Sequence, residues 1–326
     1  MKVAINGFGR IGRLTFRNLL AKGIEVVAIN DLTVNATLAH LLKYDTAHGV
    51  FGEEVSFDED NIIINGTKIP CFSEREANNL PWEKLGVDVV AECTGFYRSE
   101  EKAMQHITAG AKKVVISAPA GAEVKTIVCG VNEASVTKDD VIISNASCTT
   151  NCLAPIVKVL NDTFGIESGF LNSIHAYTSD QNIQDAPHKD LRRARAAAQS
   201  IIPTSTGAAK AVEWVIPEMK GKLDGMATRV PTITGSLTDF TFSLAKDVSV
   251  EDINEAMLKA SKNGLIGILK YEEDKLVSAD IISSNYSAIF QPDLTKKVGN
   301  QYKIIAWYDN EMGYASRMVD MILLMH

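Results

Sequence analysis

The sequence has no excess of basic residues. Its 33 Lys and Arg residues are outnumbered by 40 Asp and Glu residues, which gives a formal net charge of −7. A protein whose main ligand is nucleic acid needs a basic surface to meet the phosphates. The charge balance therefore argues against DNA or RNA as the principal partner. The one basic cluster, residues 188–195, is either a solvated surface segment or a pocket for small phosphorylated molecules.

The chain also has few cysteines and no long apolar run. Its five cysteines form no C-x-x-C pair, and its cysteines and histidines show no zinc-ligand spacing. This pattern predicts reduced thiols, a cytoplasmic location and no metal. We expect no signal peptide, because the N-terminus leads directly into a predicted strand. We also expect no membrane span, because no run approaches the roughly 20 apolar residues that one requires.

The first 31 residues predict a βαβ unit that binds a dinucleotide. A strand at 2–6 leads into Gly7-Phe8-Gly9-Arg10-Ile11-Gly12, which fits G-x-G-x-x-G, and a helix and a second strand follow. Gly7 allows a sharp turn, Gly9 lets the backbone approach a pyrophosphate, and Gly12 lets the helix pack closely on the strand. Asp31 can accept hydrogen bonds from a ribose diol and would repel a 2′-phosphate. The motif therefore predicts NAD rather than NADP.

The chain up to residue 147 continues to alternate between strands and helices. Strands are predicted at 62–64, 67–69, 87–91, 113–117, 126–129 and 141–144, and helices at 35–43 and 99–108. Asn65-Gly66 predicts a hairpin turn. Strands separated by helices predict a Rossmann-type, doubly wound parallel sheet. We therefore expect an NAD-binding domain over residues 1–147.

The second half has longer β-prone runs with fewer helices between them. Strands are predicted at 169–177, 225–230, 237–244, 286–290 and 302–308, and helices at 207–215 and 249–261. This pattern predicts an α+β catalytic domain over residues 148–310, with a mostly antiparallel sheet. The two domains are expected to pack tightly with Cys148 between them. A final helix, within residues 311–326, is expected to pack back on the first domain.

Cys148 is the strongest candidate nucleophile. It lies between a predicted strand at 141–144 and a predicted helix at 153–164. Free N–H groups at a helix start favour a thiolate, and with the help of a nearby His or Lys we expect the pKa of this thiol to be lowered. A small buried apolar residue is the alternative interpretation. The hydroxyls of Ser147, Thr149 and Thr150 favour catalysis, because a cysteine of the core has no need of them.

Other residues predict a base and anion sites. His175, late in a predicted strand, is either structural or the group that takes the thiol proton. The segment 204–207 precedes a helix and offers hydroxyl and N–H groups that can bind an anion, cap the helix, or do both. Arg195 and Arg229 are candidate phosphate ligands, because a guanidinium fork matches phosphate geometry.

Several segments together resemble the glyceraldehyde-3-phosphate dehydrogenase family from end to end. They are residues 5–13, 30–32, 144–152, 203–208, 229–232 and 307–311. The resemblance implies oxidation and phosphorylation of D-glyceraldehyde 3-phosphate to 1,3-bisphosphoglycerate, with NAD and inorganic phosphate. The reaction would pass through a cysteine hemithioacetal and a thioester, as a step of glycolysis, in a homotetramer.

The resemblance also implies roles for individual residues. Cys148 would be the nucleophile and His175 its base. The dinucleotide would be bound by the three motif glycines and by Arg10, Ile11, Asp31, Arg75, Ser117 and Asn310. The substrate phosphate would be held by Thr178, Arg195 and Arg229. Inorganic phosphate would be held by Ser147, Thr149, Thr206 and Gly207.

Two alternatives remain at this stage. Erythrose-4-phosphate dehydrogenases share the fold and the cysteine, but they tend to carry Glu at the place of Asp31 and to lack a Thr-Ser-Thr-Gly segment. A protein that only binds partners through its dinucleotide domain would not need the pair Cys148 and His175. Within the family, Ala186 leaves room for the 2′-phosphate of NADP, whereas Pro187 and Asp31 favour NAD.

Overall fold

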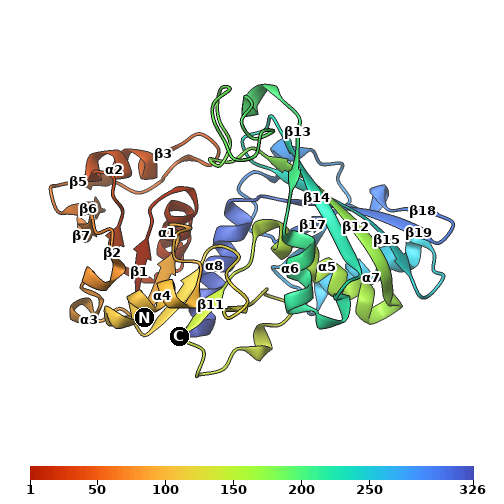
Figure 1. Ribbon diagram of the computed structural model, residues 1–326, viewed down its shortest axis with the longest axis horizontal. Helices are drawn as coiled ribbons and strands as arrows, with labels where there is room; N and C mark the ends of the chain where they lie inside the picture. The colour runs from red at the N-terminus through yellow and green to blue at the C-terminus, as the bar shows by residue number, and fades with distance from the viewer. The chain divides into compact units, whose positions relative to one another are not determined.

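The computed structural model describes all residues 1–326 and contains two compact units (Figure 1). The N-terminal unit comprises residues 1–127, 134–146 and 315–326. The C-terminal unit comprises residues 128–133 and 147–314. The last helix, α8 (Met312–Met325), begins in the C-terminal unit and ends in the N-terminal unit.

The N-terminal unit contains a nine-stranded sheet of order β10-β11-β9-β8-β1-β2-β7-β6-β5. Every pair from β10 to β7 is parallel, and only the edge strands β6 and β5 pair antiparallel. The strands are β1 (Lys2–Asn6), β2 (Glu25–Asn30), β5 (Val55–Phe57), β6 (Asn61–Ile64), β7 (Thr67–Phe72), β8 (Val89–Glu92), β9 (Lys113–Ile116), β10 (Lys125–Thr126) and β11 (Ile142–Ser144). A separate two-stranded ribbon pairs β3 (Tyr44–Asp45) with β4 (Gly49–Val50).

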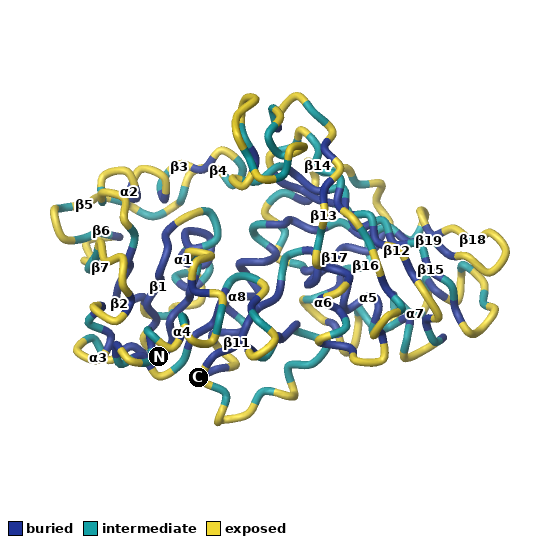
Figure 2. Tube along the Cα trace, viewed as in Figure 1, coloured by how far each residue is buried: buried dark blue, intermediate teal, exposed yellow.

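The central strands of this sheet are buried on both faces. All four residues of β8 are buried. Val3 to Asn6 of β1 are buried as well, and Figure 2 shows β1 in the colour of buried residues. Helices between parallel strands cover both faces of such a sheet, which is why successive residues of these strands are buried instead of every second one. The helices are α1 (Arg10–Ala21), α2 (Asn35–Lys43), α3 (Trp82–Leu85) and α4 (Glu100–Thr108). The predicted Rossmann-type class of this half is confirmed.

The C-terminal unit contains an eight-stranded, mostly antiparallel sheet. Its order is β13-β14-β12-β15-β19-β17-β16, with β18 also paired to β19; only β12–β14 and β16–β17 are parallel. The strands are β12 (Ile166–Ala176), β13 (Ile202–Ser205), β14 (Leu223–Val230), β15 (Ser236–Leu244), β16 (Leu269–Tyr271), β17 (Ala288–Phe290), β18 (Lys296–Val298) and β19 (Gln301–Tyr308). The predicted α+β class of this half is confirmed.

Helices cover one face of this second sheet. α5 (Cys148–Phe164) packs on β12, β15 and β19, and it also contacts α6 (Ala208–Val215) and α7 (Val250–Lys262). Strand β15 shows the consequence, because alternate residues from Ser236 to Leu244 are buried and those between them are partly exposed. His175 shares the covered face, since β12 buries Leu171, Ser173 and His175 in alternation.

Several predicted element boundaries differ from the structure. Helix α5 begins at Cys148 rather than residue 153, because the Ser147 side chain caps it by accepting a hydrogen bond from the Thr150 N–H. The strand predicted at 126–129 ends at Thr126. Beyond it the Val128 N–H bonds to the Asn132 side chain, and the chain turns at Gly130, whose φ is +79°. The predicted helices at 35–43 and 249–261 agree to within one residue, and Ser249 and Asp252 form a capping box.

The helices of this chain all fall short of the length and apolar character that a bilayer crossing requires.

Candidate active site

Cys148 is the first residue of α5, directly after the N-cap Ser147. The Ser147 hydroxyl accepts the Thr150 N–H at 3.0 Å and bonds to the Thr150 hydroxyl at 2.7 Å. Two residues before Cys148, Ala146 has a φ of +54°, in the left-handed region that side chains other than glycine rarely adopt. This tight turn and the serine cap together fix the thiol at the start of the helix.

His175 lies beside this thiol. Its Nε2 is 3.4 Å from the Sγ of Cys148, and its Nδ1 is 2.6 Å from the carbonyl oxygen of Ala176. A carbonyl can only accept, so Nδ1 carries the proton and Nε2 presents its lone pair to the thiol. The structure therefore brings the predicted nucleophile and base together, with the imidazole in the tautomer that can remove the thiol proton.

Burial controls the protonation of both groups. Burial raises the pKa of the Cys148 thiol, although the Arg229 charge and hydrogen bonds at Thr149 act to lower it. Burial, reinforced by the Arg229 charge, lowers the pKa of His175 to about 3. The helix start by itself therefore does not lower the pKa of this thiol, because desolvation outweighs the effect of the N–H groups.

Proton transfer within the pair changes this balance. It creates a thiolate and an imidazolium at the 3.4 Å separation of Sγ and Nε2. At that separation the two charges attract by about 5 kcal/mol for an effective dielectric constant of about 20. Neither charge is favourable alone, but each offsets the other. The two residues are therefore expected to titrate as a coupled unit.

A buried hydroxyl chain supports the site from one side. The Tyr308 hydroxyl lies 2.8 Å from the Thr149 hydroxyl and 2.7 Å from the Ser173 hydroxyl. Burial raises the pKa of Tyr308, which keeps the phenol neutral. The Tyr308 ring also meets the His175 ring edge to face, with centroids 6.0 Å apart. Sequence reasoning assigned no role to Tyr308 or Ser173, although Tyr308 lies within a segment that carries the resemblance.

Arg229 provides a positive charge with no acidic partner. It lies opposite His175 in the register of β14 and β12, and its Nη1 donates to the Thr178 hydroxyl at 3.0 Å. The same Nη1 donates to the Ala176 carbonyl at 3.3 Å, the Asp180 charge acts on Arg229 without a direct bond between them, and the Arg229 Nε is buried without a hydrogen-bond partner. A guanidinium in this state is suited to a phosphate group. Two of the three residues predicted for the substrate phosphate, Thr178 and Arg229, therefore lie in contact.

Arg195, the third, lies elsewhere in the loop that follows β12. Its side chain is exposed and pairs with Asp185 at 2.7 Å. Arg193 is instead the cation whose charge acts on Arg229 and lowers its pKa, in addition to the effect of burial. Arg193 is held by Asp180 and by the Thr204 hydroxyl. Sequence reasoning missed Arg193, because nothing in the spacing of this basic segment shows which arginine faces inward.

The segment before α6 was predicted to bind an anion or to cap the helix. Gly207 is the N-cap residue, and the Thr206 hydroxyl accepts the Ala208 N–H at 3.2 Å. Gly207 has no side chain to cap the helix, so this bond to Thr206 is the contact that a hydroxyl of the segment makes with the first N–H group of α6. The other N–H groups of this helix start remain suitable for an anion.

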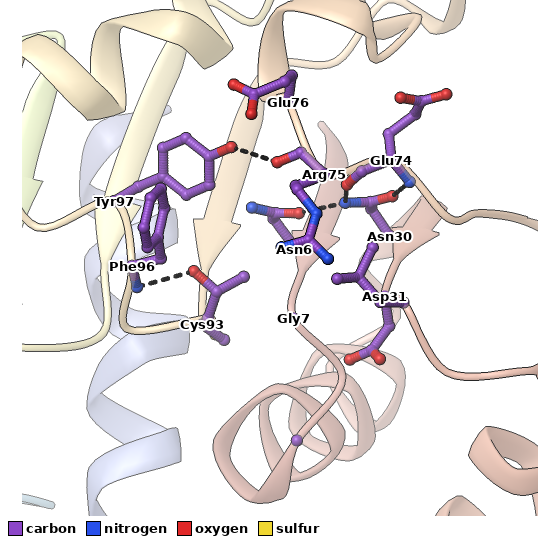
Figure 3. Close-up of a pocket in the computed structure, with 13 residues that line it drawn as sticks. Asn6, Gly7, Asn30, Asp31, Glu74, Arg75, Glu76, Cys93, Phe96 and Tyr97 are labelled. Atoms are coloured by element: carbon purple, nitrogen blue, oxygen red, sulfur yellow. Dashed lines mark hydrogen bonds between the residues drawn. The ribbon is translucent and has the colours of Figure 1, made fainter.

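The N-terminal unit contains a cavity of about 460 Å³ at the carboxyl ends of β1, β2 and β8 (Figure 3). Gly7, Gly9, Asp31 and Arg75 line it, as predicted for the dinucleotide. Asp31 is held in place by the Phe8 N–H at 2.7 Å and the Thr33 N–H at 2.9 Å. Ligands of open parallel sheets bind at this edge of the strands.

The three glycines of the motif behave differently from one another. Gly7 has a φ of +90°, and a Cβ there would lie 2.6 Å from the Thr94 nitrogen. A Cβ at Gly12 would overlap the carbonyl oxygen of Gly7. A Cβ at Gly9 would meet nothing within 4 Å, and no side chain caps the helix there. The open space at Gly9 and the free start of α1 fit a pyrophosphate.

The remaining residues predicted to bind the cofactor are divided between the two units. The Arg10 side chain is bound by Asp45 at 2.5 and 3.2 Å, and Ile11 lies in the first turn of α1. Ser117 follows β9 in the N-terminal unit, where its N–H donates to the Glu92 carbonyl at 2.9 Å. Asn310 belongs to the C-terminal unit, and its Oδ1 accepts the Ser236 hydroxyl at 2.8 Å.

Comparison with family models decides the relationship. The model of the glyceraldehyde 3-phosphate dehydrogenase C-terminal domain matches residues 147–310, and that of its NAD binding domain matches residues 1–100. The chain belongs to the glyceraldehyde-3-phosphate dehydrogenase family. The resemblance drawn from its sequence segments is thus confirmed, and NAD is its cofactor.

Individual relatives are similar over nearly the whole chain. Glyceraldehyde-3-phosphate dehydrogenase of Mycolicibacterium smegmatis is 56% identical over 333 residues, covering 99% of this chain and 98% of that protein. The enzyme of the same name from Clostridium pasteurianum is 56% identical over 325 residues, covering 98% and 96%. That of Mycobacterium tuberculosis is 54% identical over 332 residues, covering 99% and 98%.

Proposed function

We propose that this chain oxidises D-glyceraldehyde 3-phosphate and joins it to inorganic phosphate, giving 1,3-bisphosphoglycerate in glycolysis. The observation that carries the proposal is the Cys148 Sγ at 3.4 Å from the His175 Nε2, with the Arg229 guanidinium on the neighbouring strand, opposite His175. Membership of the family supplies the substrate. The erythrose 4-phosphate alternative is not favoured, because the relatives named here are triose phosphate enzymes by name.

His175 moves one proton through the reaction. Its Nε2 takes the Cys148 proton as the sulfur attacks the aldehyde carbon, and it returns that proton to the hemithioacetal oxygen. It then removes the hydroxyl proton as a hydride leaves the same carbon, which produces a thioester on Cys148. NAD, when bound, supplies the acceptor for this hydride. Attack of inorganic phosphate on the thioester releases the acyl phosphate, and His175 protonates the departing thiolate.

The proposal assigns the anions to separate groups of residues. Thr178, Arg195 and Arg229 would hold the substrate phosphate, and Arg229 is favoured most because it lacks an acidic partner. Ser147, Thr149, Thr206 and Gly207 would hold inorganic phosphate. Residues 148–310 would thus form the catalytic domain.

Residues 1–147, together with the helix in 311–326, would form the NAD-binding domain. Gly7, Gly9 and Gly12 would shape the turn, and the N–H groups of Arg10 and Ile11 would face the pyrophosphate. Asp31 would bind the adenosine ribose and Arg75 the adenine side. Ser117 and Asn310 would contact the nicotinamide end.

An assay of NADH formation tests the proposed reaction. The purified protein is given triose phosphate, erythrose 4-phosphate or neither, with and without inorganic phosphate. We expect rapid turnover only with triose phosphate and inorganic phosphate together. Turnover that prefers erythrose 4-phosphate, or that ignores inorganic phosphate, would contradict the proposal.

Asp31 is expected to decide the choice between NAD and NADP. Its carboxylate lines the cavity and is fixed by two N–H groups, so it would stand against a 2′-phosphate. We expect kcat/KM for NAD to exceed that for NADP by at least about tenfold, which requires about 1.4 kcal/mol of discrimination. Asp31→Gly should narrow the gap, mainly by weakening NAD.

Asp31→Asn serves as the closest variant in shape, because it removes the charge and keeps an oxygen for the Phe8 N–H, although it gives up the bond from the Thr33 N–H. Kinetics with both cofactors measure all three proteins. Equal kcat/KM values for NAD and NADP in the unmodified protein would contradict this prediction. They would indicate that the small side chain of Ala186, and not the charge of Asp31, determines the choice of cofactor.

We further propose that the protein acts as a cytoplasmic homotetramer. All five cysteines are free, which favours a reducing compartment. The sheet face opposite α5 exposes large apolar residues, with Phe170 at 68% and Met226 at 41%. These two residues line a depression of about 450 Å³ together with Asp224, Asp239 and Lys303. An apolar patch with a charged rim is typical of a subunit interface.

Phe170→Asp is expected to dissociate the assembly, because a charge at the centre of an apolar interface would be buried without a partner. Analytical ultracentrifugation should show a tetramer for the unmodified protein and smaller species for the variant. Val298→Asp, at an exposed residue of β18, is the control and should remain tetrameric. A monomeric unmodified protein at micromolar concentration would contradict the proposal.

A further inference from the structure

A buried acid and base lie behind the dinucleotide cavity. Glu92, the last residue of β8, and His106, on α4, are 1% and 0% exposed. The His106 Nε2 is 3.0 Å from the Glu92 Oε2, and the His106 Nδ1 accepts the indole N–H of Trp82 at 3.1 Å. A proton on Nδ1 would face the indole N–H, so the imidazole carries its proton on Nε2 and donates to Glu92. None of these three residues has a place in the proposed reaction.

Four donors converge on the Glu92 carboxylate. Besides His106, Oε2 accepts the Asn6 Nδ2 at 2.5 Å. Oε1 accepts the Thr94 N–H at 2.7 Å and the Thr94 hydroxyl at 2.5 Å. A buried carboxylate requires such donors, because it has lost its water. Asn6 and Thr94 both line the cavity, so the acid is satisfied largely by the cavity wall itself.

The network continues around the cavity from Asn6 (Figure 3). With its Nδ2 bound to Glu92, Asn6 offers Oδ1 to the Asn30 Nδ2 at 2.7 Å. Asn30 then bonds to both backbone groups of Glu74, at 2.8 and 2.9 Å. Glu92 thus sets the orientation of two successive amides, and these join the ends of β1 and β2 to the segment after β7.

The other side of the cavity depends on the same pair. The Thr94 hydroxyl, which donates to Glu92, accepts the Phe96 N–H at 3.0 Å. The Tyr97 ring lies against His106 with centroids 5.1 Å apart, and its hydroxyl donates to the Arg75 carbonyl at 2.8 Å. Phe96, Tyr97 and Arg75 line the cavity, and Figure 3 shows the bond from Tyr97 to Arg75.

We propose that Glu92 and His106 are positioning residues for NAD: they hold the walls of the adenosine side of the cavity in the binding conformation from behind. The pair does not touch the cofactor in this role. It acts through Asn6 and Thr94, which it orients, and through Tyr97, which packs on it.

Two substitutions separate this role from simple packing. Glu92→Gln keeps the size of the side chain but places an amide NH2 group where Oε2 stands. This NH2 group faces the Asn6 Nδ2 and the His106 Nε2–H, which are also donors, so both of their hydrogen bonds are lost. His106→Gln can still donate to Glu92 and accept from Trp82, whereas His106→Leu can do neither. Asp88→Asn is the control, because Asp88 immediately precedes β8, at the far end of the strand from Glu92, and forms a surface ion pair with Lys112.

Calorimetric titration with NAD and with ADP-ribose is the decisive measurement. We expect Kd to rise at least about tenfold in Glu92→Gln and His106→Leu, within the range for a buried polar group left unpaired. It should stay within about threefold of the unmodified value in His106→Gln and Asp88→Asn. KM for NAD should rise as Kd does, whereas kcat at saturating NAD should fall less than about threefold.

Iodoacetamide labelling of Cys148 without NAD provides an internal check, and its rate should not change. If His106→Leu does not fold, the comparison of Glu92→Gln with His106→Gln decides alone. Equal Kd values in those two variants would overturn the proposal, as would a loss confined to kcat. The unmodified protein is measured in parallel. If it does not bind NAD, the proposed function is contradicted, whereas a failure of the variants to differ contradicts only the role of Glu92 and His106.

Discussion

Cys148→Ser is expected to form no NADH from glyceraldehyde 3-phosphate above background. The pKa of a serine hydroxyl lies far above that of a thiol, which is about 8.5 when unperturbed, so the alkoxide is much rarer than the thiolate at neutral pH. His175 cannot make up this difference with a bond of the same geometry. We therefore expect a loss of at least about 10,000-fold in kcat/KM, measured by NADH formation in the presence of inorganic phosphate.

Cys152→Ser is the matched control on the same helix. Cys152 is fully buried, and its sulfur meets the Thr238 hydroxyl at 3.4 Å. Burial raises the pKa of this thiol to about 12, so iodoacetamide should label Cys148 first. Peptide mass spectrometry gives the order of labelling. Preferential labelling of Cys152, or equal losses in the two serine variants, would show that the nucleophile is misassigned.

His175→Asn should slow hydride transfer by roughly 100- to 10,000-fold, the range for loss of a general acid and base. It should also change the pH dependence of Cys148 alkylation. The imidazolium formed by proton transfer stabilises the thiolate 3.4 Å away, and burial acts in the opposite direction. Without the cation, the pKa of Cys148 rises, the thiolate fraction at a given pH falls, and the alkylation curve moves to higher pH.

The measurement is the rate of iodoacetamide alkylation across pH, together with single-turnover formation of NADH. His40→Asn makes the same chemical change at an exposed histidine of α2 and should alter neither. An unchanged alkylation curve in His175→Asn would mean that the helix start and Arg229 alone activate the thiol. In that case His175 would act only after the sulfur has attacked.

Local patterns predicted the parts of the fold that depend on neighbouring residues. β1, α1 and β2 follow from an apolar strand, a glycine turn and helical spacing, and the structure places them within one or two residues of the expected ranges. The hairpin at Asn65-Gly66 is equally local, because positive φ values at both residues select it. The start of α5 was predicted five residues late. Thr149, Thr150 and Asn151 are weak helix formers, and the helix begins before them only because the single side chain of Ser147 caps it.

Sequence patterns did not reach the features that depend on contacts between distant residues. Which arginine faces Arg229 depends on the path of a loop, and no spacing distinguishes Arg193 from Arg195. The hydroxyl chain through Tyr308 joins residues 159 and 135 positions apart. Glu92 and Asn6 are separated by 86 positions and meet only because β1 and β8 are neighbours in the sheet.

The sequence by itself determined the dinucleotide turn, the cysteine at a helix start and the family, since these are properties of short segments. A glycine motif sets backbone dihedrals, and the N–H groups of a first helical turn exist wherever the helix begins. Only the tertiary structure decided that His175 reaches Cys148 in the proton-accepting tautomer, and that burial opposes the thiolate. Strand order and register determine which side chains meet, and burial depends on everything packed around them. The meeting of two distant side chains and the burial of a group both depend on the packing of the whole fold, so no short segment of sequence determines either of them.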